Sequence, residues 1–196
     1  MQPTSIALHP AAVLDVESGE LLERATVVVE GDRITAVSSE RSAGAGADLV
    51  VECPDLTLTP GLMDMEVNFM LGGPGAAVDD PIRVDPALMT LRAAVNARRT
   101  LRAGFTTVRN LGLFIKTGGY LTDVALAQAV DAGWTEGPRI VPAGHAITSS
   151  GAHLDPCAQM STAPHIMPMT VEEGVADGPD AVRRAVRYQI RYGARV

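Results

Sequence analysis

Residues 1–59 alternate short runs of apolar, β-branched residues with polar turns. Runs of this kind, separated by pairs such as Ser18-Gly19 and Gly31-Asp32, are typical of short β-strands joined by tight turns. Residues 25–37 have the pattern of a hairpin, and the Ser-, Ala- and Gly-rich residues 39–48 predict an exposed loop. The pattern predicts a small β domain with strands at residues 5–8, 11–15, 25–30, 33–37, 49–53 and 56–58.

After Gly61 the pattern changes to strands that alternate with helices. Apolar positions at helical spacing, followed in each case by a Gly, predict helices over residues 86–103, 122–132 and 180–192. Strands are predicted over residues 62–69, 105–110 and 139–143, with a fourth strand beginning at Ala194. A long irregular stretch, typical of a functional or disordered loop, covers residues 144–170.

The alternation of strand and helix indicates an α/β fold with a parallel sheet and helical crossovers. A (β/α)8 barrel requires about 250 residues, so residues 60–196 would hold the first half of one. Because a half barrel would expose unpaired strand edges, we expect further polypeptide after Val196. An open α/β sheet that is complete as it stands is the alternative.

Composition and charge exclude some function classes. The net charge of −7 and the pI of about 5.0 argue against an electrostatic surface for nucleic acid or an acidic membrane. No apolar run has the length of a membrane-spanning helix, and the N-terminus lacks the pattern of a signal peptide. With only Cys53 and Cys157, which we expect to be free thiols, the chain is predicted to be cytoplasmic.

The most informative motif is Pro60-Gly61-Leu62-Met63-Asp64, followed by Glu66 and Asn68. It resembles the first barrel strand of the metal-dependent amidohydrolase superfamily, which usually reads apolar-PG-apolar-D-x-H-x-H. Residues 103–110 resemble the AGFTTVRD segment of its imidazolonepropionase-like and Xaa-Pro dipeptidase subgroup, and residues 137–155 resemble GPR-strand-loop-GGHGD. In this order and spacing, the segments make the chain similar to the N-terminal half of such a protein.

This resemblance implies a (β/α)8 barrel with a composite β-sandwich, residues 1–59 belonging to the sandwich and residues 60–196 to the barrel. It also implies a divalent metal (zinc, cobalt or iron) that activates water to attack a C=O group. The bridging lysine, the later histidines and the catalytic aspartate of the family would all follow Val196. We expect one metal ion per chain. We also expect a small-molecule substrate and assembly into a homo-oligomer.

Glu66 and Asn68 occupy the positions of the two metal-binding histidines, and their spacing places both on the same side of a strand. Three interpretations stay open. The site has collapsed to one metal held by later residues, as in the phenylurea and thiocarbamate (molinate) hydrolase branch; or Glu66 is a true ligand; or catalysis has been lost. A carboxylate is a hard oxygen ligand, whereas a neutral amide binds zinc or cobalt much less strongly than imidazole does.

Two other positions are candidate substrate-binding residues. Asn110 stands where the subgroup usually has Asp, and His153 stands at the histidine of GGHGD. His145 and His165 lie in the same irregular stretch, and Met160, Met167 and Met169 fit an apolar wall. The chain contains neither a complete phosphate-binding loop, since residues 72–75 lack the Gly-Lys-Ser/Thr ending, nor a Gly-x-Ser-x-Gly elbow.

These observations favour a hydrolase that cleaves a C–N bond of a urea, carbamate, thiocarbamate or amide by metal-activated water. An Xaa-Pro or Xaa-Arg dipeptidase, or an imidazolonepropionase-like hydrolase, is the alternative within the superfamily. A catalytically inactive barrel subunit is the alternative from another class, because fold alone does not determine function.

Overall fold

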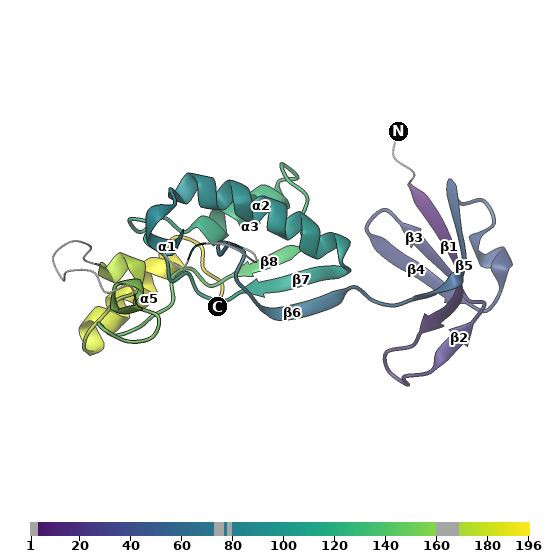
Figure 1. Ribbon diagram of the computed structural model, residues 1–196. Coiled ribbons are helices and arrows are strands. Elements are labelled where there is room, and N and C mark those ends of the chain that lie inside the picture. The colour runs from purple at the N-terminus through teal and green to yellow at the C-terminus, as the bar shows by residue number, and fades with distance from the viewer. Residues whose placement is uncertain (1–3, 73–76, 78–79, 160–168) are drawn as a thin grey trace. The chain divides into compact units, whose positions relative to one another are not determined.

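The structure, a computed structural model, describes residues 4–72, 77, 80–159 and 169–196 (Figure 1). The chain divides into two compact units, Met1–Pro60 and Gly61–Val196. Within the described residues, no helix has the length and apolarity needed to cross a bilayer.

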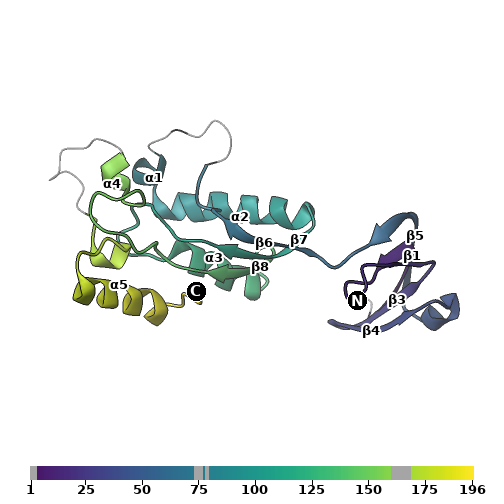
Figure 2. The same cartoon turned by 90° about the horizontal axis from the view of Figure 1, so that it is seen from below.

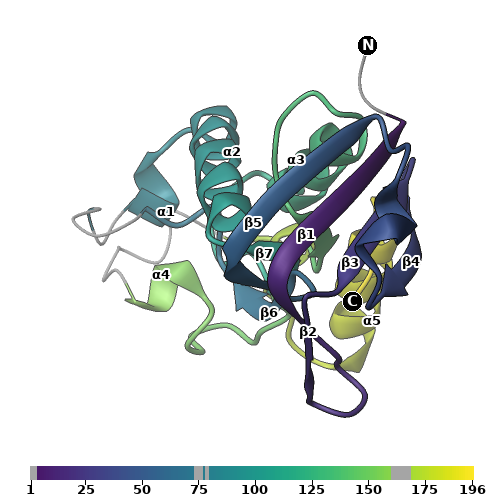
Figure 3. The same cartoon turned by 90° about the vertical axis from the view of Figure 1, so that its right-hand side faces the viewer.

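The N-terminal unit is a five-stranded mixed sheet. Its elements are β1 (Ser5–Leu14), β2 (Leu21–Glu23), β3 (Thr26–Glu30), β4 (Arg33–Ser38), the 3-10 helix η1 (Arg41–Gly44) and β5 (Leu49–Leu58). The strand β1 pairs antiparallel with β2 and β3 and parallel with β5, while β3 and β4 form the predicted hairpin (Figure 3). A small core forms around Val13, Ala25 and Val27.

The strand boundaries in this unit differ from the prediction. The runs at 5–8 and 11–15 are one strand, β1, whose register with β5 shifts between Pro10 and Ala12. Proline interrupts the sequence pattern because it has no N–H to donate, yet a strand tolerates it at such an irregularity. The runs at 49–53 and 56–58 likewise join in β5, and the predicted loop 39–48 contains η1.

The C-terminal unit is built on a three-stranded parallel sheet in the order β6-β7-β8 (Figure 2). Its elements are β6 (Leu62–Val67), α1 (Asp80–Arg83), α2 (Pro86–Arg102), β7 (Phe105–Asn110), α3 (Thr122–Asp131), β8 (Arg139–Pro142), α4 (Pro156–Gln159), the 3-10 helix η2 (Val171–Glu173) and α5 (Pro179–Arg191). The three predicted helices and the three predicted strands are confirmed, and the mixed α/β class with them.

The helix α2 shows why the sequence folds in this way. The Asp85 side chain caps it by accepting hydrogen bonds from the backbone N–H groups of Ala87 (2.8 Å) and Leu88 (3.4 Å). Its buried residues Met89, Ala93 and Ala97 recur at every fourth position and belong to the same core as Val108 of β7, Ile140 of β8, and Leu126 and Ala127 of α3. The two helices α2 and α3 therefore pack on the same core.

The predicted fourth strand is not formed by residues 194–196 in the described part of the chain. The backbone N–H of Arg195 donates one hydrogen bond of 2.8 Å to the carbonyl oxygen of Pro142, the last residue of β8. One such bond places these residues beside β8 but does not make a ladder. The prediction of a strand over these residues was wrong for the described chain.

Candidate active site

The carboxyl ends of β6, β7 and β8 meet at one edge of the parallel sheet, where they line a cavity. Its volume is about 640 Å³. The lining residues come from these strand ends, the following loops, α5 and the end of the chain: Glu66, Asn68, Arg109, Leu111, Gly112, Phe114, Ala143, His145, Ala146, Ile147, Leu154, Val186, Gln189, Ile190 and Val196. Glu66 and Asn68 both line this cavity, and their role as metal ligands stays a prediction.

A β-bulge shapes the end of β6. Asp64 pairs with Val108 and Val67 pairs with Asn110, so two residues of β6 stand opposite the single residue Arg109 of β7. The Arg109 Nε donates a hydrogen bond of 2.8 Å to the carbonyl oxygen of Met65, which is one of those two residues. The other is Glu66, whose backbone N–H donates to the Asp64 Oδ1 at 2.9 Å. These two bonds fix the backbone from which Glu66 and Asn68 project.

The described residues do not by themselves form a metal site. No group of three or more His, Cys, Asp or Glu side chains with metal-binding geometry occurs among them. The cavity offers one carboxylate, Glu66, and two neutral amides, Asn68 and Gln189, and Arg109 lines it as well. One carboxylate and neutral amides are weak donors for a zinc or cobalt ion compared with imidazole.

Asn110 does not line this cavity but a much smaller one, of about 10 Å³, which it shares with Asn68. It is 1% exposed, and its Oδ1 accepts a hydrogen bond of 3.0 Å from the backbone N–H of Phe69. Successive residues of a strand point to opposite faces, so Arg109 lines the cavity while Val108 points into the core. This bond ties the end of β6 to β7, and the predicted contact of Asn110 with substrate stays a prediction. The alternation along β7 was the signal that would have singled out Arg109.

His145 lines the cavity directly after β8 and is only 2% exposed. Its Nε2 lies 2.8 Å from the Thr117 Oγ1, and its backbone N–H donates to the Gln189 Oε1 at 2.9 Å. Burial lowers the pKa of the imidazole from 6.5 to about 4, although the Glu173 carboxylate raises it in part. His145 is therefore neutral at pH 7, and it braces the wall of the cavity between two loops and α5.

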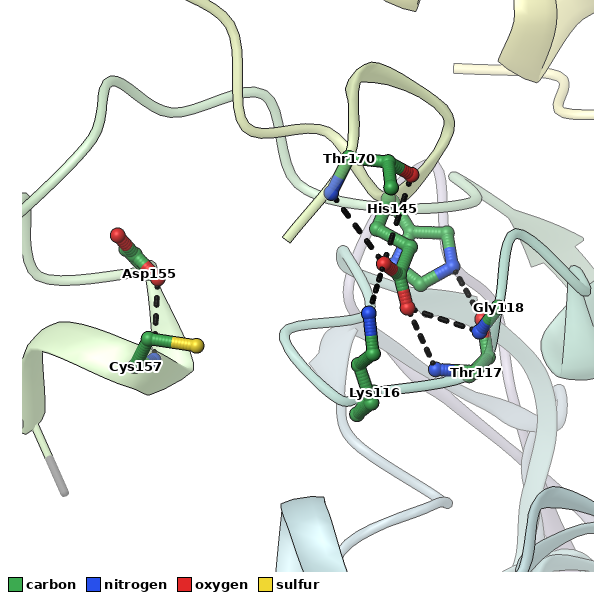
Figure 4. A network of polar contacts seen from close by, with 8 residues as sticks. Lys116, Thr117, Gly118, His145, Asp155, Cys157 and Thr170 are labelled. Atoms are coloured by element: carbon green, nitrogen blue, oxygen red, sulfur yellow. Dashed lines mark hydrogen bonds and ion pairs between the residues drawn. The ribbon is translucent and has the colours of Figure 1, made fainter. Parts of the chain in front are cut away.

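A buried carboxylate holds the loops behind His145 together (Figure 4). The Glu173 side chain is 0% exposed and accepts hydrogen bonds from the Lys116 Nζ (2.7 Å) and from the backbone N–H groups of Thr117 (2.9 Å) and Gly118 (2.8 Å). Burial alone would raise the pKa of this carboxyl, but Lys116 and the two amides lower it more, so its net pKa lies below the ordinary value. Thr170 closes the network, since its backbone N–H donates to Glu173 at 3.3 Å.

His153 is exposed and does not line the cavity, whereas the next residue, Leu154, does. The turn that carries both is fixed by Asp155, which accepts hydrogen bonds from the backbone N–H groups of Gly151 (2.9 Å) and Cys157 (3.0 Å). Substrate binding by His153 stays a prediction. Met169 is half-buried, while His165, Met160 and Met167 lie outside the described residues.

A second cavity, of about 420 Å³, lies between the first turns of α2 and α3. Its walls are largely apolar and include Pro86, Ala87, Leu121 and Ala125. None of the predicted site residues lines it, so it offers a comparison for tests of the first cavity.

No protein-family model matches the chain. The ochratoxinase of Aspergillus niger is 30% identical over an alignment of 207 positions, which covers 95% of this chain and 40% of that protein. Among solved structures, an Xaa-Pro dipeptidase with bound methionine is 30% identical with a TM-score of 0.83, over 97% of this chain and 45% of the other. An amidohydrolase is 33% identical with a TM-score of 0.78, again over 97% and 45%.

The chain matches the N-terminal half of amidohydrolase-type proteins. The resemblance seen in the sequence is thereby confirmed, and the chain spans about two fifths of the length of the curated relatives that it matches. Phenylurea hydrolase B, 24% identical with a TM-score of 0.61 over 80% of this chain and 35% of the other, shares the fold.

Proposed function

We propose that the complete protein is an amidohydrolase that cleaves a C–N bond of a urea, carbamate, thiocarbamate or amide with water. The observation that carries this proposal is the cavity at the carboxyl ends of β6, β7 and β8, lined by Glu66, Asn68 and Arg109. In (β/α)8 enzymes the active site lies at this face of the sheet. The 30% identity to an ochratoxinase supports the same class of reaction.

The proposal includes a full (β/α)8 barrel, completed by polypeptide after Val196. Within the described residues β6 pairs with β7 alone, and Leu62, Met63 and Met65 are 51%, 70% and 51% exposed. Apolar side chains on an open strand edge favour burial against further strands. The N-terminal sheet likewise exposes Ile34 and Leu56 (68% and 63%), which supports a sandwich completed by another segment.

The proposal includes one divalent metal ion per chain, which is zinc, cobalt or iron. Because the Glu66 carboxylate and the Asn68 amide are too few donors to hold a divalent ion by themselves, we propose that its other ligands and the catalytic acid or base follow Val196. A small-molecule substrate and a homo-oligomer complete the proposal. The inactive barrel subunit is the outcome to be expected if those later residues lack metal-binding side chains.

A dipeptidase that cleaves Xaa-Pro bonds is the second candidate, because an Xaa-Pro dipeptidase matches at 30% identity and a TM-score of 0.83. The cavity wall carries the apolar residues Leu111, Phe114 and Ile147. Such a wall favours a substrate with a large apolar group over a small polar dipeptide.

The proposal is tested with the complete protein on an aryl-urea, a thiocarbamate, an N-acyl amino acid and an Xaa-Pro dipeptide. We expect hydrolysis of at least one of the first three, abolished by a chelator and restored by one divalent metal per chain. Turnover of the dipeptide alone would favour the second candidate. No turnover of any of the four, with metal bound, would contradict both.

A further inference from the structure

We propose that Asn68 donates a hydrogen bond to the carbonyl oxygen of the substrate, and that Asn110 orients Asn68 through one ordered water molecule. The inference rests on the proposed function, because the substrate would bind in the cavity at the ends of β6, β7 and β8. It makes Asn68 a catalytic residue that contacts the reacting carbonyl group, and Asn110 a positioning residue that acts through it.

The small cavity of about 10 Å³ adjoins the large cavity of about 640 Å³. Asn68, Gly112 and Phe114 line both cavities, whereas Asn110 lines only the small one. A volume of about 10–15 Å³ is the least that holds one water molecule. Asn68 therefore stands between a space for a substrate and a space for a single water.

Asn110 brings a donor without a partner to this small cavity. Its Oδ1 accepts a hydrogen bond of 3.0 Å from the backbone N–H of Phe69, so the oxygen end of the amide is fixed. The other end, Nδ2, is buried and has no hydrogen-bond partner in the described part of the chain. Because a buried N–H that stays unpaired is costly, a water in the small cavity is the acceptor that Asn110 requires.

The same water reaches Asn68. Asn68 and Asn110 have the only polar side chains in the described lining of the small cavity, which otherwise consists of Met70, Leu71, Gly112, Leu113, Phe114 and Ile115. A water that accepts from the Asn110 Nδ2 has two O–H groups to donate, and the Asn68 Oδ1 is the side-chain acceptor available to it. The hydrogen bonds then run from Asn110 to the water and from the water to Asn68.

This direction decides what Asn68 offers to the large cavity. With its Oδ1 turned to the water, Asn68 presents its Nδ2 as a donor, and the carbonyl oxygen of a substrate is an acceptor. That oxygen gains negative charge as water attacks, and an asparagine amide is among the donors that stabilise such a charge. The oxygen through which a neutral amide binds a metal is then engaged, which leaves Glu66 as the β6 side chain that can join the proposed metal ligands.

The experiment combines a crystal structure of the complete protein, at about 1.2 Å resolution where hydrogens become visible, with metal content and kinetics of four variants. These are Asn68→Asp, Asn110→Asp, the double variant and Gln128→Glu. Each replaces an amide by a carboxylate of the same shape, and Asn110→Asp keeps an acceptor for the Phe69 N–H. Gln128 is exposed on α3, outside the described lining of both cavities, and controls for the added charge.

We expect one water within hydrogen-bond distance of the Asn110 Nδ2 and the Asn68 Oδ1. Asn68→Asp should lower kcat about 100-fold or more with unchanged KM and metal content, because the lost donor acts in the transition state. Asn110→Asp should lower kcat about tenfold, and the double variant should be no slower than Asn68→Asp alone, since both changes break one unit. Gln128→Glu should keep the kcat of the wild type.

A metal bonded to the Asn68 Oδ1, or full kcat in Asn68→Asp, would overturn the proposal. A small cavity without water, or effects that multiply in the double variant, would overturn the role of Asn110. If a variant does not fold, the wild-type crystal structure still decides the orientation of Asn68. A wild type that shows the bridging water but hydrolyses none of the four test substrates would contradict the proposed function and leave this orientation supported.

Discussion

Replacing Glu173 with Gln tests whether the buried carboxylate holds the loops around the cavity. The substitution keeps the shape of the side chain and removes its charge. Glu173 is fully buried and accepts hydrogen bonds from Lys116, Thr117 and Gly118 at 2.7, 2.9 and 2.8 Å. A glutamine retains one acceptor oxygen and turns an NH2 group toward one of these donors.

The expected cost follows from the burial of the two partners. Removing one member of a buried ion pair costs about 3–5 kcal/mol, because the other charge is left without compensation. The Lys116 side chain is 29% exposed and so keeps part of its hydration. We therefore use the lower end of this range of energies. We expect Glu173→Gln to reduce the free energy of unfolding by about 3 kcal/mol at pH 7.

Urea unfolding of the wild type and the variant measures this difference, with Glu172→Gln as the matched control. Glu172 is adjacent and only half-buried, and we expect its substitution to cost less than about 0.5 kcal/mol. Because the folded-state pKa of Glu173 is lowered, its contribution is present above its ordinary pKa of 4.5 and is lost as the pH falls below that value. Equal costs for the two variants, or a difference that persists at low pH, would refute the reasoning.

Two further predictions concern the same wall of the cavity. Burial lowers the pKa of His145 from 6.5 to about 4, so the unfolded state takes up a proton at a higher pH than the folded state does. The stability that the neutral His145 contributes is therefore present above pH 6.5 and is lost as the pH falls toward 4. Between pH 7 and pH 5 we expect the free energy of unfolding to fall by about 2 kcal/mol, at about 1.4 kcal/mol per pKa unit. This fall should be absent in His145→Gln. A midpoint near pH 6.5 in an NMR titration of the imidazole would show the account to be wrong. Gly174 has φ +86°, and a Cβ there would meet the carbonyl oxygen of Ala146, whereas Gly178 has φ +81° with open space around it. Both Gly→Ala variants should lose about 1 kcal/mol from the backbone conformation, and Gly174→Ala should lose clearly more in urea unfolding, unless the contact with Ala146 relaxes without cost.

The elements of the C-terminal unit could be predicted because their signals are local. The cap at Asp85, the fourfold spacing of Met89, Ala93 and Ala97, and the glycine after the last turn all lie within α2 and its ends. Glu66 and Asn68 line the cavity as the resemblance implied, although a bulge interrupts β6 at Glu66 and Asn68 lies after its end.

The remaining features of the site depend on contacts between distant residues, which local patterns do not encode. Lys116 and Glu173 are 57 residues apart in the chain, and nothing near either residue indicates that they form a pair. The bulge opposite Arg109 is a difference in register between two strands, which the sequence of β6 alone does not specify. The burial of His145 has no local signal either, because a histidine in a loop is more often hydrated than buried.

The central claim is that the cavity at the ends of β6, β7 and β8 is where a C–N bond is hydrolysed. The most direct test is kcat/KM of the complete protein when each of the two cavities is filled by a tryptophan. Ile147→Trp fills the first cavity and Ala125→Trp the second, and both wild-type side chains are partly exposed. We predict that Ile147→Trp lowers kcat/KM at least about tenfold, or about 1.4 kcal/mol, with an unchanged Tm, while Ala125→Trp has no effect. Full activity in Ile147→Trp, or a loss confined to Ala125→Trp, would contradict the account.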